Sequence, residues 1–539
     1  MGYNVLVTET ISEKGLSILE NDKNIHLNII KGMTENELKN IISDYDAIIT
    51  RSGTRITSDL LENPGRLKII GRAGVGLDNI DIEAASRKGI IVMNAPTGNT
   101  IAATELTMGH ILSAARKIPE ANNSLLEGKW DRKKFLGIQL YEKTLGIVGL
   151  GRIGSNVALR AKAFDMDIVA YDPYIKRTKA DALGVRLIDK FEDLLAISDI
   201  VTFHTPLTNE TYKMLSDKEM KFMKDGAIVI NCARGGIIDE DGLLKALNSG
   251  KLFAAGIDVF EKEPPKDNPL LKVNNVFFTP HIGANTFEGQ KSVAVIIAEQ
   301  VLSALKGENY INAVNIPFIK SQLSTYHRLY FELIEKIGKL AAQVIKGRIE
   351  KIEINLIGRH FEEDINEPVF DRPLNYQPFT IAGIKGFLEV ILKDSVTYMS
   401  APYLAQDRNI TISETKDKQL EEYNNLIMMK IKTDTEEKEI GGTVLSDQMG
   451  RLTVLDKFHL DIIPQGIFLY FRNYDKPGVI GKVGTILGNN SINIAGFGLS
   501  RQNEGKAMGF VSVDNSITKK TLDEILNING IIEAKTIKF

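Results

Sequence analysis

One short segment constrains the fold of this chain more than any other. An apolar run over residues 144–148 leads directly into Gly149-Leu150-Gly151-Arg152-Ile153-Gly154, and an amphipathic helical pattern follows over residues 155–163. In this G-x-G-x-x-G spacing, the first glycine permits a tight turn, the second lets the backbone approach a pyrophosphate, and the third lets the helix pack closely on the strand. The start of such a helix presents free N–H groups to phosphates. The segment therefore predicts a strand–turn–helix unit that binds a dinucleotide.

A second predicted strand, residues 168–171, ends at Asp172. A carboxylate at this place can accept hydrogen bonds from both ribose hydroxyls and would repel a 2′-phosphate, which favours NAD over NADP. Lys176 and Arg177 follow closely, and their charges weaken that preference. The alternative interpretation is a glycine-rich packing turn that ends in a surface aspartate.

The wider pattern predicts a multidomain α/β protein. A length of 539 residues suggests three or four domains. From residue 1 to about 315, short apolar runs alternate with amphipathic segments, which is typical of βα units on a parallel sheet. The candidate strands cover residues 4–8, 47–50, 68–71, 144–148, 167–171, 200–203, 227–231, 254–259 and 276–279.

Composition excludes several classes of function. The 66 basic and 69 acidic residues give a formal charge of −3, so nothing draws the whole chain toward nucleic acid or an anionic membrane. Cys232 is the only cysteine, which rules out an intramolecular disulfide and a thiolate-rich zinc site, and no metal is expected. No stretch approaches about 18 uninterrupted apolar residues, so we expect no membrane span and a cytoplasmic protein.

The remainder of the chain has a different pattern of apolar and charged residues. Residues 318–455 combine a helical pattern over 324–346 with an alternating segment at 351–356, and the charged stretch 413–423 predicts a solvated helix or loop. The final seventy or so residues have the order strand, helix, strand, strand, helix, strand. That order builds a ferredoxin-like sheet with two helices on one face.

Three charged or titratable side chains come after predicted strands: Arg234, Glu263 and His281. Ligands of open α/β sheets bind at the carboxyl ends of the strands, so these residues are candidates for one site. Hydride exchange with a 2-hydroxy acid needs a cation for the carboxylate, an acid/base for the hydroxyl proton and a carboxylate that orients the base. Taken singly, each residue could also be a surface ion pair, a loop charge or a loop histidine.

Together these segments resemble the D-2-hydroxyacid dehydrogenases, and the resemblance spans residues 1–317. It rests on GRAGVGLDN at 71–79, NAPTGNT at 94–100, the 149–154 fingerprint, HTPLT at 204–208, NCARGG at 231–236, DVFEKEP at 258–264 and PHIGA at 280–284. The resemblance implies two Rossmann-like doubly wound lobes, with an NAD-binding lobe (99–285) inserted in a substrate-binding lobe (1–98 and 286–317). An α+β intervening domain (318–455) and a ferredoxin-like ACT regulatory domain (456–539) would follow.

The resemblance also implies roles for the site residues. Arg234 would hold the substrate carboxylate, His281 would be the acid/base and Glu263 its partner. The implied cofactor contacts are Gly149, Gly151, Arg152, Ile153, Gly154, Asp172, Thr205, Cys232, Ala233, Arg234, Asp258, His281, Gly283 and Ala284. Cys232 is interpreted as packing near the nicotinamide and not as a nucleophile. His204 is an alternative to His281 as the base, but it lies in the family's cofactor loop and is interpreted as capping or packing. Where the family commonly continues with Ser-Thr, this chain has Asn285-Thr286.

The expected substrate is 3-phospho-D-glycerate, which the family's longer members oxidise to 3-phosphohydroxypyruvate. Two segments that end strands would form an anion pocket from arginines and backbone N–H groups; their residues are Arg51, Ser52, Arg72, Gly74 and Val75. Arg132 would complete the phosphate site from a partner subunit. Solvated surface charges are the alternative for all three arginines.

The segment NYDKPGVIGKVG at 473–484, with INI at 492–494, resembles ACT domains, which pair side by side and bind small amino acids at the seam. By position, Asn473, Asp475 and Asn493 would contact an effector, expected to be L-serine, in a homodimer or homotetramer. The alternative is a dimerisation module without ligand. Residues 318–455 could bind an anion that controls activity.

Two other functions stay open at this stage. One is a glyoxylate or hydroxypyruvate reductase, although such enzymes usually stop after the catalytic core. The other is an NAD-sensing transcriptional corepressor, which would carry a peptide-binding cleft and disordered tails.

Overall fold

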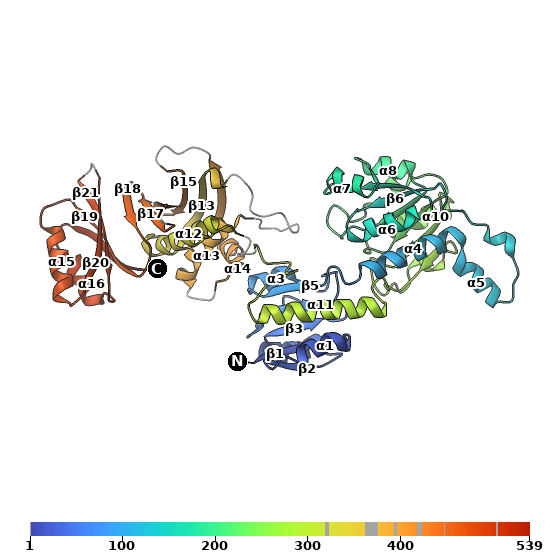
Figure 1. Ribbon diagram of the computed structural model, residues 1–539, viewed down its shortest axis with the longest axis horizontal. Helices are drawn as coiled ribbons and strands as arrows, with labels where there is room; N and C mark the ends of the chain where they lie inside the picture. Colours follow the sequence, from blue (N-terminus) through green and yellow to red (C-terminus); the bar gives the residue numbers. More distant parts are fainter. Residues whose placement is uncertain are drawn as a thin grey trace.

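The computed structural model describes residues 2–318, 323–361, 376–392, 396–417, 423–446, 448–502 and 505–539. Their strands form four sheets, of which the first two are parallel (Figure 1). The predicted α/β class is therefore confirmed. In the described part of the chain, no helix is both long and apolar enough to cross a membrane.

The first sheet has five parallel strands in the order β2-β1-β3-β4-β5. The strands are β1 (Tyr3–Val7), β2 (Ile25–Ile29), β3 (Ala47–Thr50), β4 (Ile69–Arg72) and β5 (Ile91–Asn94), and the helices are α1 (Glu13–Glu20), α2 (Glu35–Ile41), η1 (Ile42–Asp44), α3 (Ile82–Arg87) and α11 (Phe287–Leu305). Helix α11 returns to this sheet from much later in the chain. Its Ile297 and Val301 leave no room for a side chain at Gly71, because Val301 Cγ2 lies 2.7 Å from the place of a Cβ there.

The second sheet has seven parallel strands in the order β12-β11-β10-β9-β6-β7-β8. The strands are β6 (Thr144–Val148), β7 (Asp167–Tyr171), β8 (Arg186–Leu187), β9 (Ile200–Phe203), β10 (Ala227–Asn231), β11 (Leu252–Ile257) and β12 (Val276–Phe278). Its helices and turns are α4 (Thr100–Arg116), α5 (Ile118–Leu126), η2 (Arg132–Phe135), α6 (Arg152–Lys162), α7 (Arg177–Ala182), α8 (Phe191–Ile197), α9 (Asp217–Met220), α10 (Glu240–Asn248) and η3 (Pro269–Lys272). The strand order reverses between β6 and β9, and such a switch point is where doubly wound sheets bind ligands.

A mixed sheet of six strands follows, in the order β14-β13-β15-β16-β17-β18. The strands are β13 (Ile349–Gly358), β14 (Thr411–Asp417), β15 (Asn425–Thr433), β16 (Glu437–Val444), β17 (Gly450–Leu455) and β18 (Phe458–Ile462), and the helices are α12 (Thr325–Val344), η5 (Arg359–Phe361), α13 (Pro378–Leu392) and α14 (Ser400–Gln406).

One expectation for this region needs correction. Residues 413–417 of the charged stretch 413–423 belong to the edge strand β14 and not to a helix or loop; residues 418–422 lie outside the described residues. Strand β18 pairs with β17, so the six-stranded sheet continues past residue 455.

The last sheet has four antiparallel strands in the order β20-β21-β19-β22, which is the ferredoxin-like order that the sequence predicts. The elements are β19 (Ile467–Tyr474), α15 (Val479–Asn489), β20 (Ile494–Arg501), β21 (Lys506–Val513), α16 (Lys519–Leu526) and β22 (Ile531–Lys538). Both helices cover one face. On the other face, Phe468, Tyr470 and Phe510 join the same buried core as Phe458 and Ile462 of β18, so the third and fourth sheets share one apolar core.

The six-stranded sheet and its helices also contact the five-stranded lobe. At the contact between α3 and α14, Arg87 pairs with Asp407, and its guanidinium lies 5.1 Å from the ring centre of Tyr403. These interactions link the shared core of the last two bodies to the five-stranded lobe (Figure 1).

Candidate active site

The glycine turn after β6 has the geometry of a phosphate cradle. Gly149 has φ +91°, and a Cβ there would lie 2.8 Å from the carbonyl oxygen of His204. A Cβ on Gly154 would lie 2.1 Å from the carbonyl oxygen of Gly149, so α6 packs closely on β6 only because this residue is glycine. Gly151, the N-cap of α6, has no atom within 4 Å of its Cβ place. Space is therefore open where a pyrophosphate would approach the helix N-terminus, beside Arg152 and Ile153.

Two polar side chains flank this turn. Asp172, at the end of β7, accepts hydrogen bonds from the N–H groups of Leu150 (2.9 Å) and Tyr174 (3.0 Å), which fixes its carboxylate beside the turn. The buried Thr205 hydroxyl has no hydrogen-bond partner among the described residues. A buried hydroxyl without a partner is costly unless a ligand satisfies it. The open cradle, the fixed carboxylate and the free hydroxyl fit a dinucleotide.

His281 and Glu263 form a hydrogen-bonded pair. His281 Nδ1 lies 2.7 Å from Glu263 Oε2, and Glu263 Oε1 accepts the N–H of Phe260 at 3.1 Å. Partial burial opposes ionisation of Glu263, but the bonds from His281 and Phe260, with the charges of His281 and Arg234, hold its pKa below the ordinary range. Because the carboxylate engages Nδ1, Nε2 of the ring is the nitrogen that can exchange a proton with a substrate.

Arg234 reaches from the second lobe to the first. Its Nη1 donates to the carbonyl of Ala233 at 2.7 Å, and its Nε lies 3.3 Å from Asp78 Oδ2. A Cβ on Gly76 would lie 2.3 Å from Nη2, so the guanidinium uses the space that a side chain would fill. The predicted carboxylate-binding arginine thus lies at the junction of the two lobes.

Arg72 and Gly74 lie at the same junction. Burial and the nearby charge of Arg234 lower the pKa of Arg72 to about 10, and its Nη1 occupies the place of a Gly74 side chain. Arg72 Nε is buried without a partner among the described residues. Val75 accepts a hydrogen bond from Asn94 Nδ2 at 2.6 Å, which fixes the turn. The structure therefore brings two arginines from different lobes together.

The segment after β3 differs from the expectation. The N–H groups of Arg51, Gly53 and Thr54 donate to Glu9 at 2.9, 3.2 and 2.9 Å, so these donors are not free for an anion. Burial works against the Glu9 charge, but those three backbone bonds leave its pKa lowered. Arg51 Nη1 donates to the carbonyl of Thr10 at 3.1 Å, and Ser52 is exposed. Glu9, which lies 42 residues from Arg51, was not among the predicted site residues.

Arg132 lies in η2, beyond α5, and is exposed. Figure 1 shows α5 projecting from the second lobe, away from β3 and β5. One chain therefore does not bring Arg132 to the other predicted substrate residues. The projecting segment carries large exposed apolar side chains, namely Ile118, Leu125, Leu126, Trp130 and Leu136.

Cys232 and His204 both have pKa values that are shifted mainly by burial. Burial and the Asp258 charge raise the pKa of the Cys232 thiol, which keeps it protonated and unsuited to act as a nucleophile. Burial lowers the pKa of His204 to about 3, and its Nε2 lies 3.1 Å from Thr202 Oγ1. Next to Cys232, the N–H of Ala233 donates to Asn231 Oδ1 at 3.0 Å.

Asp258 organises the loop that carries His281. Its buried carboxylate accepts hydrogen bonds from Thr279 Oγ1 (2.5 Å), the Ile282 N–H (2.8 Å) and the Gly283 N–H (3.0 Å). Both of its oxygens are thus engaged within the chain, so Asp258 fixes the backbone of Ile282 and Gly283, next to Ala284. Asn285 is turned toward α11, where its Oδ1 accepts from Gln290 Nε2 at 2.5 Å.

One chain also does not bring the three predicted effector residues together. Asn473 pairs with Ala507, and Asp475 lies 3.4 Å from Arg501 at the same end of the sheet. Asn493 precedes the first residue of β20, which pairs with Val513 at the opposite end, and it donates to Asp514 at 2.7 Å. The buried Asn473 Oδ1 has no partner in the described part of the chain.

Comparisons with known proteins agree with this geometry. The family model for the NAD-binding domain of D-isomer specific 2-hydroxyacid dehydrogenases matches residues 108–283, and the model for the D-3-phosphoglycerate dehydrogenase intervening domain matches residues 327–456. D-3-phosphoglycerate dehydrogenase of Archaeoglobus fulgidus is 41% identical over 98% of this chain and 99% of its own length. The Bacillus subtilis protein of the same name is 38% identical over 99% of both chains.

Among solved structures, D-lactate dehydrogenase from Aquifex aeolicus, complexed with NAD and lactic acid, is similar with a TM-score of 0.52 and 31% identity; the match covers 58% of this chain and 99% of that one. The TT0316 protein from Thermus thermophilus is similar with a TM-score of 0.54 and 35% identity, over 58% of this chain and 99% of that one.

Proposed function

Since this chain belongs to the D-2-hydroxyacid dehydrogenase family, in its D-3-phosphoglycerate dehydrogenase branch, we propose that it oxidises 3-phospho-D-glycerate to 3-phosphohydroxypyruvate with NAD. The observation that carries this proposal is the His281–Glu263 pair, with Nδ1 and Oε2 2.7 Å apart, in the same lobe as an open dinucleotide cradle. We also propose that the enzyme works in the cytoplasm.

The proton of the 2-hydroxyl goes to His281. Its Nε2 accepts this proton as C2 loses a hydride, and the ionised Glu263 stabilises the imidazolium that forms. NAD, when bound, supplies the hydride acceptor; the 149–154 turn, Asp172 and Thr205 would hold it. Arg234 offers a planar fork to the substrate carboxylate, which places C2 next to the acid/base.

Arg72 and Arg51 are proposed to bind the phosphate. A substrate with a carboxylate and a phosphate needs more cationic contacts than lactate, and the Arg72 guanidinium has a buried N–H without a partner in the described part of the chain. Arg132 would join the phosphate site from a second subunit. The exposed apolar side chains of the projecting segment support a homo-oligomer in which that segment lies against the partner.

L-serine is proposed as the effector of the C-terminal domain. Strand β20 is an edge strand, and an antiparallel pair of two such edges places the start of one β20 beside the end of the other. Asn493 of the partner subunit would then lie near Arg501, which is ion-paired with Asp475. The two residues that one chain keeps apart would face the same seam.

The deciding experiment measures NADH formation from 3-phosphoglycerate and NAD, with a phosphohydroxypyruvate trap, in the presence and absence of L-serine. We expect turnover that serine suppresses. Turnover that ignores serine would keep the enzyme and remove the effector assignment. Bound NAD without turnover would reject 3-phosphoglycerate as substrate; glyoxylate and hydroxypyruvate, tested with NADH, would then identify a reductase.

A further inference from the structure

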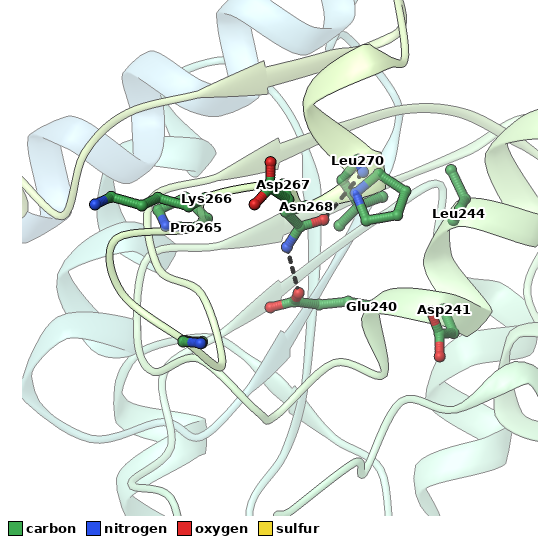
Figure 2. A pocket seen from close by; sticks show the side chains of 10 residues that line it. Glu240, Asp241, Leu244, Pro265, Lys266, Asp267, Asn268 and Leu270 are labelled. Carbon is green, nitrogen blue, oxygen red and sulfur yellow. Dashed lines mark hydrogen bonds between the residues drawn. The ribbon is translucent and has the colours of Figure 1, made fainter.

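The segment that carries Glu263 packs on Gly235 at its start, where the backbone of Phe260 and Glu261 lies, but it has few buried side chains beyond that point. It is anchored by the buried side chains of Phe260 and Leu270, but Glu261, Lys262 and Glu263 between them are exposed. A hollow of about 160 Å³ separates part of the segment from α10 (Figure 2). Without packing on that side, the position of the segment depends on polar contacts.

Glu240 supplies two of these contacts. One of its oxygens accepts the N–H of Glu261 at 2.8 Å, and the other accepts Nδ2 of Asn268 at 2.6 Å. Figure 2 shows the second bond, which joins two residues that line the hollow. The Glu261 carboxylate in turn accepts the Tyr212 hydroxyl at 2.8 Å. A single carboxylate thus ties down both ends of the segment in which Glu263 lies.

The support beneath Glu240 is rigid. Glu240 is the first residue of α10, whose start is capped by Asp239 accepting the Gly242 N–H at 3.1 Å. Leu243 and Leu247 of this helix are buried in the core of the lobe. A displacement of the Glu261 backbone would pass to Glu263, two residues later, and would lengthen its 2.7 Å contact with His281.

We propose that Glu240 is a positioning residue for the Glu263–His281 pair. This inference rests on the proposed function, in which His281 takes the substrate proton. The Glu240 carboxylate touches no reacting atom; it acts by holding the 261–268 segment so that Glu263 stays opposite Nδ1 of His281.

The test replaces Glu240 by Ala and by Gln, with Asp241→Asn as the matched control. Asp241 lies in the same helical turn and lines the same hollow, so its substitution also removes one charge there. We expect Glu240→Ala to lower kcat about tenfold while KM stays near that of wild type, because a displaced Glu263 no longer orients His281 for proton transfer. In a Glu263→Gln background, the same substitution should have no further effect on kcat. Glu240→Gln, which keeps one acceptor and the side-chain volume, should lie between Glu240→Ala and wild type.

Two results would overturn the proposal: variants of Glu240 that match Asp241→Asn, or a loss of kcat that is just as large in the Glu263→Gln background. NAD affinity, measured separately, reports whether the lobe is folded; if Glu240→Ala loses it, the same two criteria apply to Glu240→Gln. Loss of turnover in His281→Ala, combined with unaltered Glu240 variants, would refute the positioning role while keeping the proposed function.

Discussion

At the scale of single residues, His281 is where the proposed chemistry is concentrated. Its Nδ1 is held by Glu263 at 2.7 Å, so substitution by alanine removes the proton acceptor without removing any buried support of the fold. We expect His281→Ala to lower kcat by about two orders of magnitude or more, while NAD affinity stays near that of wild type. Steady-state kinetics measure the expected loss of kcat, and titration with NAD measures the cofactor affinity. A variant with nearly normal turnover would contradict the assignment.

Glu9 gives a prediction of a different kind, on substrate binding and pH. Glu9→Gln removes the charge that holds the N–H groups of Arg51, Gly53 and Thr54, so the KM for 3-phosphoglycerate should rise while NAD affinity is unchanged. A lowered pKa means that the folded state binds the Glu9 proton less readily than the unfolded chain. The stability from this charge is therefore present above the unfolded pKa, about 4.3, and disappears as the pH falls through the lower folded value.

Denaturant unfolding as a function of pH checks this sign. At pH 7 the Gln variant should be less stable by about 1 kcal/mol or less, since Glu9 is partly exposed to solvent, and the two curves should converge in acid. A difference between the proteins that persists unchanged below the folded pKa would contradict the electrostatic explanation.

At the scale of elements, the β6–α6 turn separates folding from cofactor binding. A Cβ on Gly154 would lie 2.1 Å from the Gly149 carbonyl, whereas one on Gly151 meets no atom within 4 Å. Gly154→Ala should therefore lower the free energy of unfolding by about 1–3 kcal/mol. Gly151→Ala should leave stability within about 0.5 kcal/mol but weaken NAD binding about tenfold or more, because its Cβ enters the cradle. Equal effects of both variants on stability would contradict this division.

The elements also show what the sequence can and cannot predict. Strands β6, β7, β9 and β10 match the predicted ranges to the residue, because central parallel strands are buried on both faces and form uninterrupted apolar runs. Strand β14 was missed because it is an edge strand, half exposed and charged, which leaves no apolar alternation. The short strands β2, β5 and β8 were also not predicted.

The residues of the candidate site likewise include some that the sequence reveals and some that it does not. Arg234, Glu263 and His281 could be found because each follows a strand and has a distinctive chemistry. Glu9 and Glu240 could not, because their roles depend on backbone N–H groups 42–45 and 21 residues away, contacts that only the folded chain creates. The separation of Asn493 from Asp475 depends on strand register, which a single sequence does not specify.

At the scale of the whole molecule, the last two sheets share one core, and Arg87 connects that body to the substrate lobe through Asp407 and Tyr403. The ammonium of Lys535 also donates to the carbonyls of Gln343 and Val344 at the end of α12, at 2.9 and 3.1 Å. Within the described residues, packed elements therefore connect the four-stranded sheet to the six-stranded sheet and, through Arg87, to the five-stranded lobe.

Whether the effector seam joins two chains can be decided by subunit mixing. Chains with Asp475→Ala and chains with Asn493→Ala should each form oligomers that serine no longer inhibits. In a mixed pair, the intact Asp475 of one chain faces the intact Asn493 of the other, so one of the two effector sites at the seam is complete. Coexpressed and tag-selected mixed oligomers should then regain serine inhibition, although to a smaller extent than wild type. If both residues acted within one chain, every site in the mixture would lack a residue and no inhibition would return.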